Sequence, residues 1–201
     1  MIEVKYITHA CFEISGNKTI LIDPFFNGNE TNPHYNGNPD IVLVTHEHFD
    51  HADAGNMKGK IVAPHTVNIP NKIEMKIGDE KVIDGIKIKM IRASHYQSKY
   101  PTGYIITMDG KNIAHLGDTY LDGVDPLGNI DLLLVPIGGH YTMNIEEALK
   151  AVEIIKPKMV IPMHYNTFKE IKADPNVFKS KATAMGYKAI VLNYNESIKI
   201  Q

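Results

Sequence analysis

Cysteine is almost absent from this chain: Cys11 is the only one among 201 residues. A single cysteine cannot form an intramolecular disulfide, and it cannot supply a zinc module built on paired cysteines. We therefore interpret Cys11 as a small buried residue that packs beside the first strand.

Long apolar runs are also missing, and none approaches the roughly 20 residues that a membrane-spanning helix needs. The first residues, MIEVKYITHACFEISG, alternate between apolar and polar side chains. They lack the basic segment followed by an apolar segment that marks a secretory signal. We expect a cytoplasmic protein with no membrane partner.

The chain has no excess of either charge and no run of lysine or arginine, and its formal net charge is −2. This balance gives no electrostatic reason to expect nucleic acid as a partner. A hydrophobic content of 43% and a charged content of 22% are typical of a globular protein. We expect residues 1–201 to form one domain that acts on a small molecule; the sequence leaves homo-oligomer formation open.

The pattern of apolar residues predicts an α/β fold. Short strand-like segments dominate the first half, and strands alternate with helices in the second. Residues 41–44 are a continuous apolar run, and residues 130–137 are apolar apart from Asp131; both are expected to be strands buried on both faces. Helices are predicted at 144–155, capped by Asn144 with Glu147, and at 175–186. Residues 27–40 are a polar loop that could act as a lid. Two sheets packed face to face with helices outside account for this order.

The stretch VTHEHFDH at residues 44–51 concentrates metal-binding side chains directly after a predicted buried strand. His46 and His48, two residues apart in extended backbone, point to the same side. Asp50 and His51 follow where the chain turns, and we expect a short helix to begin there. One segment could therefore present two ligand pairs to two neighbouring ions, whereas a solvated loop gains nothing from this spacing.

Three further candidates each follow a predicted strand and open a loop. They are His95 in ASH, Asp118 in HLGDT and His164 in PMHYN. Strand ends are where α/β proteins usually present their site residues. The repeated placement favours convergence of these side chains with the 44–51 segment.

These motifs resemble the metallo-β-lactamase superfamily, whose signature is His-x-His-x-Asp-His, a later His, a bridging Asp and a final His. THA near the N-terminus, LIDPF at 21–25 and PIGGHYTMNIEEA at 136–148 narrow the resemblance. They are similar to a branch of small metal-dependent hydrolases related to the L-ascorbate-6-phosphate lactonases and, more distantly, to N-acylphosphatidylethanolamine phospholipase D. The resemblance implies an αββα sandwich of two mixed sheets flanked by helices.

Carried over by position, the resemblance assigns seven metal ligands to two ions. His46, His48 and His95 would hold one ion and Asp50, His51 and His164 the other, with Asp118 bridging them. We expect two divalent ions per chain; zinc suits these ligands best, but manganese, iron and nickel also fit them. A hydroxide shared by the ions would attack a small ester, lactone or phosphoester.

Several other polar residues near these motifs have two interpretations. Asp50 is expected to orient the nucleophile as well as bind metal. His140 either stabilises the oxyanion or protonates the leaving group, or it has a structural role in its loop, and His9 is a weaker candidate of the same kind. Asp23 either supports a turn or, as the resemblance implies, accepts a hydrogen bond from a ligand imidazole.

The remaining residues of these motifs are interpreted as structural. We expect Glu47 to face solvent or an ion pair and Phe49 to pack, with neither taking part in the chemistry. His34, His65 and His115 are interpreted as structural histidines. Two functional alternatives stay open: a nuclease or phosphodiesterase of the same superfamily, and a non-catalytic metal-binding regulatory module.

Overall fold

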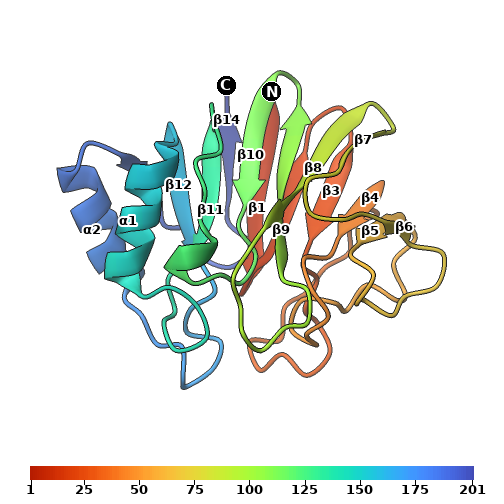
Figure 1. Cartoon of the computed structure of the whole chain (residues 1–201), viewed down its shortest axis with the longest axis horizontal. Helices are drawn as coiled ribbons and strands as arrows, with labels where there is room; N and C mark the ends of the chain where they lie inside the picture. The colour runs from red at the N-terminus through yellow and green to blue at the C-terminus, as the bar shows by residue number, and fades with distance from the viewer.

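Alternating and fully apolar strands assemble into two seven-stranded sheets in the computed structural model, which describes residues 1–201 (Figure 1). The first sheet has the order β14(Ser197–Ile200), β1(Ile2–Thr8), β2(Cys11–Ser15), β3(Thr19–Ile22), β4(Ile41–Leu43), β5(Lys60–Ala63), β6(Ile73–Glu74). The second has the order β13(Lys188–Ala189), β12(Met159–Met163), β11(Leu132–Pro136), β10(Lys111–His115), β9(Thr102–Met108), β8(Ile86–Arg92), β7(Glu80–Ile83). Both sheets are mixed: β14, β1, β2 and β3 pair antiparallel, as do β7 to β10, whereas β3 to β6 and β10 to β13 pair parallel.

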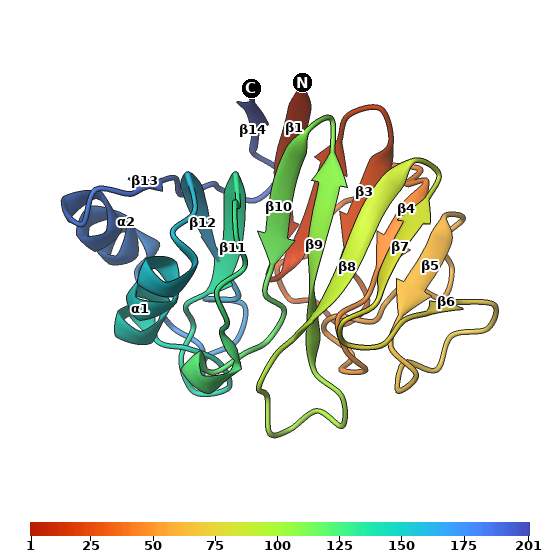
Figure 2. The same ribbon diagram turned by 45° about the horizontal axis from the view of Figure 1, so that its top comes forward.

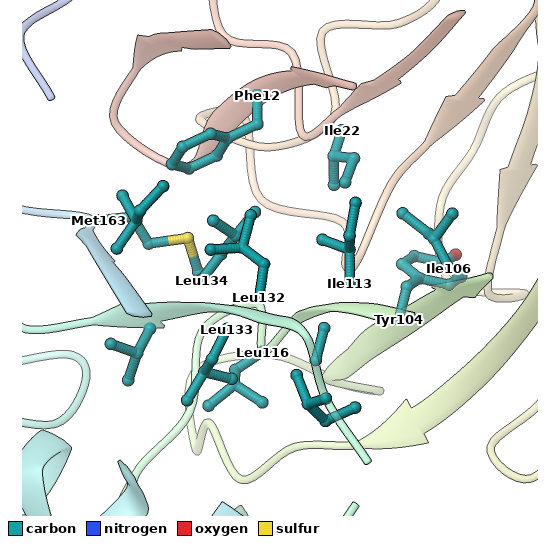
Figure 3. Packing of buried hydrophobic residues seen from close by; sticks show 14 of the residues in the cluster. Phe12, Ile22, Tyr104, Ile106, Ile113, Leu116, Leu132, Leu133, Leu134 and Met163 are labelled. Atoms are coloured by element: carbon teal, nitrogen blue, oxygen red, sulfur yellow. The ribbon is translucent and has the colours of Figure 1, made fainter. Parts of the chain in front are cut away.

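The core lies between the two sheets, where alternate side chains of each strand meet. Figure 3 shows Leu132 and Leu134 of β11 pointing toward Phe12 of the first sheet. Leu133 points to the opposite side of the same strand, toward the helices. All five residues of β11 are buried, which is why its sequence is a continuous apolar run rather than an alternation.

Two helices, α1(Ile145–Ile155) and α2(Pro175–Ala184), pack outside the second sheet beside β11 to β13 (Figure 1). The predicted capping box of α1 is present, because the Glu147 amide donates to Asn144 Oδ1 and the Asn144 amide donates to Glu147 Oε2, both at 3.0 Å. The only other helical element is a short 3₁₀ turn, η1(Leu121–Gly123). The predicted sandwich of two mixed sheets is confirmed.

Loops, rather than helices, cover the outer face of the first sheet. A second apolar cluster forms there, and it includes Cys11, whose predicted burial is confirmed. The helix expected to begin at Asp50 is absent. His48 O instead accepts hydrogen bonds from the amides of both His51 and Ala52, which makes one isolated turn. Residues 27–40 form no strand or helix, as predicted.

Buried hydrogen bonds connect the two sheets near one edge of the sandwich. The Tyr104 hydroxyl donates to Val44 O at 2.9 Å, and the Thr102 hydroxyl donates to Thr45 O at 2.6 Å. His115 Nε2 lies 2.8 Å from Ala10 O, so this buried histidine has the structural role predicted for it. The long loops of both sheets gather at one edge, opposite the chain termini (Figures 1 and 2). None of the helices combines the length and apolar character required to cross a bilayer.

Candidate metal centre

The first group of donor atoms comes from three histidines that follow strands of different sheets. His46 and His48 follow β4, and His95 follows β8. His48 Nδ1 lies 3.1 Å from His46 Nε2 and 3.3 Å from His95 Nε2. The backbone beyond β4 bends, so that both rings of the His-x-His pair point to one place.

The second group lies beside the first. It brings Asp50 and His51 together with His164, which follows β12, and it also includes His9 from the turn between β1 and β2. Within each group the possible ligand atoms all lie within 4.8 Å of one another. The structure therefore gathers the seven residues predicted from sequence and adds His9.

Asp118 lies between the two groups and turns one carboxylate oxygen to each. Its Oδ2 is 3.8 Å from His46 Nε2 and 3.7 Å from His95 Nε2. Its Oδ1 is 3.3 Å from His51 Nε2 and 3.1 Å from His164 Nε2. This is the arrangement that a bridging carboxylate requires.

Gly117 makes the position of Asp118 possible. Its φ of +62° lies in the left-handed region, where a side chain is unfavourable. A Cβ there would also lie 2.3 Å from the Thr102 carbonyl oxygen, which is too close for any other residue. The chain can therefore leave β10 tightly against β9 and present Asp118 at the edge of the sandwich.

Hydrogen bonds on the outer side of two rings fix which nitrogen faces the centre. His95 Nδ1 contacts Tyr141 O at 3.0 Å, and His48 Nε2 contacts Gln97 O at 3.1 Å. Because a carbonyl only accepts, each of these nitrogens carries a hydrogen. The other nitrogen of each ring is left with its lone pair directed at the donor group.

Asp23 fixes in the same way which nitrogen of His51 faces the centre. It is fully buried, and its Oδ2 lies 2.7 Å from His51 Nδ1. Its two oxygens also accept from the Thr45 amide at 2.8 Å and the Thr45 hydroxyl at 2.7 Å. Of the two interpretations of Asp23, the geometry favours the acceptor that orients an imidazole.

His9 connects the second group to both halves of the molecule. Its Nε2 lies 3.1 Å from Asp50 Oδ2, and its Nδ1 contacts the Thr167 hydroxyl. Its carbonyl accepts from the His164 amide at 2.8 Å and from the Tyr6 hydroxyl. The backbone of His9 is left-handed, with a φ of 53°, a conformation uncommon for histidine. A histidine at the tight turn after β1 was the sequence signal for this position.

Burial and neighbouring charges shift the pKa values of the residues of the centre in different directions. Burial lowers the pKa of His46 well below its usual value, lowers that of His95, and lowers that of His9 to about 4. Burial opposes ionisation of Asp118, but the adjacent His164 and His51 hold its pKa well below the usual range. Burial also opposes charging of His51, yet the carboxylates of Asp118, Asp50 and Asp23 raise its pKa. Near neutral pH the lowered imidazoles are neutral and the carboxylate is anionic, as metal ligands must be.

Several donor atoms of the second group are buried and have no hydrogen-bond partner. They are His51 Nε2, His164 Nε2 and Asp118 Oδ1. Buried polar atoms normally find a partner, and these three converge on one point. A divalent cation would satisfy all of them at once, so the residues present fit a metal.

The centre opens into a cavity of about 580 Å³. Its lining combines centre residues with three polar and three aromatic side chains: Glu47, His48, Phe49, Asp50, His95, Gln97, Asp118, Tyr141, His164, Phe168, Glu170. Glu47 makes no ion pair; it accepts from the Ser98 hydroxyl and the Lys99 amide.

One sequence expectation differs from what the structure shows here, and one residue that had two interpretations is placed. Phe49 does not pack into the core: 67% of it is exposed, because the single turn at residues 48–52 directs it outward into the cavity. His140 is exposed on a left-handed turn residue and does not line the cavity; its neighbour Tyr141 does. The placement of His140 thus gives no support to a catalytic role.

Comparison with known proteins agrees with this fold and donor set. The sequence model of the beta-lactamase superfamily domain matches residues 3–164. A UPF0173 metal-dependent hydrolase of Pyrococcus abyssi is 42% identical, with full coverage of both chains, and one of Thermoplasma volcanium is 39% identical over 99% of each. A metallo hydrolase of Ignicoccus hospitalis is 31% identical and superposes with a TM-score of 0.84, covering 100% of this chain and 99% of that one.

The fold and the histidine–aspartate centre define a metal-dependent hydrolase. The chain belongs to the metallo-β-lactamase superfamily and, within it, to the UPF0173 metal-dependent hydrolases.

Proposed function

We propose that the protein is a binuclear hydrolase that cleaves a small ester, lactone or phosphoester. The observation that carries this proposal is the position of Asp118, whose two oxygens face two separate donor groups. A site for one ion would not need a second set of histidines and a second carboxylate beside it. Zinc suits the imidazole and carboxylate donors best, and manganese, iron and nickel fit the same set.

When bound, a pair of divalent ions supplies Lewis acidity and makes an attacking water acidic enough to react near neutral pH. The protein's own residues position that chemistry. His46, His48 and His95 would hold one ion; Asp50, His51 and His164 would hold the other, with Asp118 shared. The Asp50 carboxylate is anionic, because His51 and His9 outweigh the effect of burial and lower its pKa. It can therefore orient a water at the open side of the centre.

We expect this enzyme to act in the cytoplasm, with neither nucleic acid nor a membrane as its partner. The cavity volume suits a small-molecule substrate.

The test combines elemental analysis with a substrate panel of esters, lactones and phosphodiesters. We expect about two ions per wild-type chain. Asp118→Asn should lower hydrolysis by several orders of magnitude and bind fewer ions, because one oxygen of the bridge is replaced by an amide that cannot coordinate as a carboxylate does.

Asp131→Asn is the control for the same chemical change away from the centre, where this carboxylate accepts from the Asn112 amide at 2.9 Å and contacts none of the candidate ligands. Thermal unfolding of both variants separates lost function from lost fold. Full activity and full metal content in Asp118→Asn would contradict the proposal.

A further inference from the structure

An exposed aromatic ring stands directly beside the centre, inside the signature segment. Phe49 lies between two candidate ligands, His48 and Asp50, and is held by Phe25 at 5.7 Å and Phe168 at 6.3 Å between ring centroids. Phe25 and Phe168 contact each other at 5.9 Å. We call Phe25, Phe49 and Phe168 the aromatic wall. Phe25 is fully buried and supports the other two, which face the cavity.

The exposure of Phe49 has no benefit for folding. Burying a phenyl ring would stabilise the fold by roughly 2 kcal/mol relative to leaving it in water. Edge-to-face contacts, at interplanar angles of 82° with Phe25 and 67° with Phe168, fix the ring in place instead. An apolar surface that is held rigid and open beside reactive groups is typical of a binding site.

The charges around the cavity also favour an apolar ligand over an anionic one. Among its eleven lining residues none is lysine or arginine, and the two charged residues outside the donor set are the acidic Glu47 and Glu170. The ammonium of Lys169, near the rim, lies 3.7 Å from Glu170 and is largely exposed. Apart from the oxygen that the metal ions would bind, the further anionic oxygens of a phosphate monoester, or a second carboxylate on the substrate, would meet carboxylates here. Away from a metal, such groups are usually bound by arginine, lysine or a helix N-terminus.

We propose that the substrate carries an apolar alkyl or aryl group that rests on the aromatic wall, and that its remaining part is uncharged. Among the three classes above, the cavity therefore favours acyl esters and alkyl lactones over phosphate monoesters. This inference rests on the proposed function. Phe49 is its specificity-determining residue, because Phe49 is the exposed member of the wall.

The expected change in kcat/KM follows from the apolar area of the substrate that the aromatic wall can remove from water. Each methylene fully removed from water changes an equilibrium about fourfold. On a wall open at one side we expect roughly a twofold gain in kcat/KM per methylene. With metal-loaded full-length protein, p-nitrophenyl hexanoate should react roughly 15-fold faster than p-nitrophenyl acetate, and faster than p-nitrophenyl phosphate.

Variants of Phe49 test the assignment. Phe49→Ala should remove most of the chain-length preference, measured as the ratio of kcat/KM for the hexanoate to kcat/KM for the acetate, and Phe49→Leu should retain part of it. Tyr96→Ala is the matched control: Tyr96 is 76% exposed, stacks on Tyr120 at 4.9 Å and follows His95, but does not line the cavity. It should keep the preference. Metal content measured on each variant excludes an indirect effect through Asp50.

A second measurement does not depend on turnover. The chain contains no tryptophan, so Phe49→Trp introduces a single indole fluorophore at the wall. Titration with octanoate should shift its emission to the blue, and acetate at the same concentration should not.

The possible failures are distinguishable. If protein with two ions hydrolyses no ester, lactone or phosphodiester, the proposed function is wrong, and the octanoate titration still decides whether the wall binds apolar groups. If esters are hydrolysed with no chain-length preference, if Phe49→Ala keeps that preference, or if the phosphate monoester is preferred, the assignment of the wall is overturned. Equal responses to octanoate and acetate would overturn it as well.

Discussion

Replacing Asp23 by asparagine tests whether a residue outside the donor set controls metal binding. Wild-type Asp23 accepts three hydrogen bonds, two from Thr45 and one from His51 Nδ1. The asparagine side chain has the same shape but only one accepting oxygen. If that oxygen keeps the Thr45 amide, the new NH₂ group faces His51 Nδ1, and His51 must accept there and carry its hydrogen on Nε2. That hydrogen points into the second donor group.

The magnitude follows from restoring the original tautomer. To bind a metal through Nε2, His51 must move its hydrogen back to Nδ1, where it faces another donor with no acceptor. A buried donor left without a partner costs about 1–3 kcal/mol. This range corresponds to roughly 5- to 150-fold weaker binding, which includes the 10- to 100-fold effect usual for partners of ligating histidines.

The assay is a metal titration in competition with a chromophoric chelator. We expect the affinity for the ion held by Asp50, His51 and His164 to fall by that factor. The affinity for the ion held by His46, His48 and His95 should change less than about threefold. Asp53→Asn is the matched control: Asp53 also accepts three hydrogen bonds, from the Phe26 amide and from the amide and side chain of Asn27, but contacts no histidine. Equal titrations for wild type and Asp23→Asn, or an equal loss in both variants, would refute the reasoning.

Two further predictions concern protons and the fold. The carboxylates around His51 raise its pKa, so His51 keeps its proton near neutral pH in the metal-free protein, and metal binding must expel that proton. We therefore expect roughly one proton to be released per chain, and the affinity for the ion bound by His51 to rise with pH until the raised pKa is passed. Calorimetry in buffers of different ionisation enthalpy measures the proton release. If the affinity for the ion bound by His51 did not depend on pH, His51 would already be neutral in the metal-free protein. Asn144→Ala removes the capping box of α1 and should lower the free energy of unfolding by about 1 kcal/mol without changing metal content, as measured by chemical denaturation; an unchanged denaturation midpoint would show that the cap contributes nothing.

The sequence predicted which candidate ligands converge, because each of them follows a strand that is recognisable from its apolar residues. His46, Asp118 and His164 all lie just after such strands, and strand ends from one side of a sandwich meet at one edge. The capping box at Asn144 was predictable for a similar reason: its pattern is local and needs no tertiary information.

What the sequence could not predict depends on the direction of side chains in irregular backbone. Phe49 was expected to pack, and only the turn at residues 48–52 determines that it faces the cavity. His140 follows a buried strand just as His164 does, yet the turn after Gly139 directs it to solvent. His9 shows the converse: a left-handed backbone brings it into contact with Asp50, 41 residues away.

The division of the donors between the sheets has a mechanical consequence. His46, His48, Asp50 and His51 extend from the first sheet, and His95, Asp118 and His164 extend from the second. Any ion held by both sets is a cross-link between the two halves of the molecule, and the sheets cannot separate until it dissociates. At a metal concentration a thousand times the dissociation constant, one such ion adds about 4 kcal/mol to the free energy of unfolding. In a chain whose single cysteine can form no internal disulfide, bound metal would be a reversible substitute for one, and a chelator would loosen the fold as it stopped the reaction.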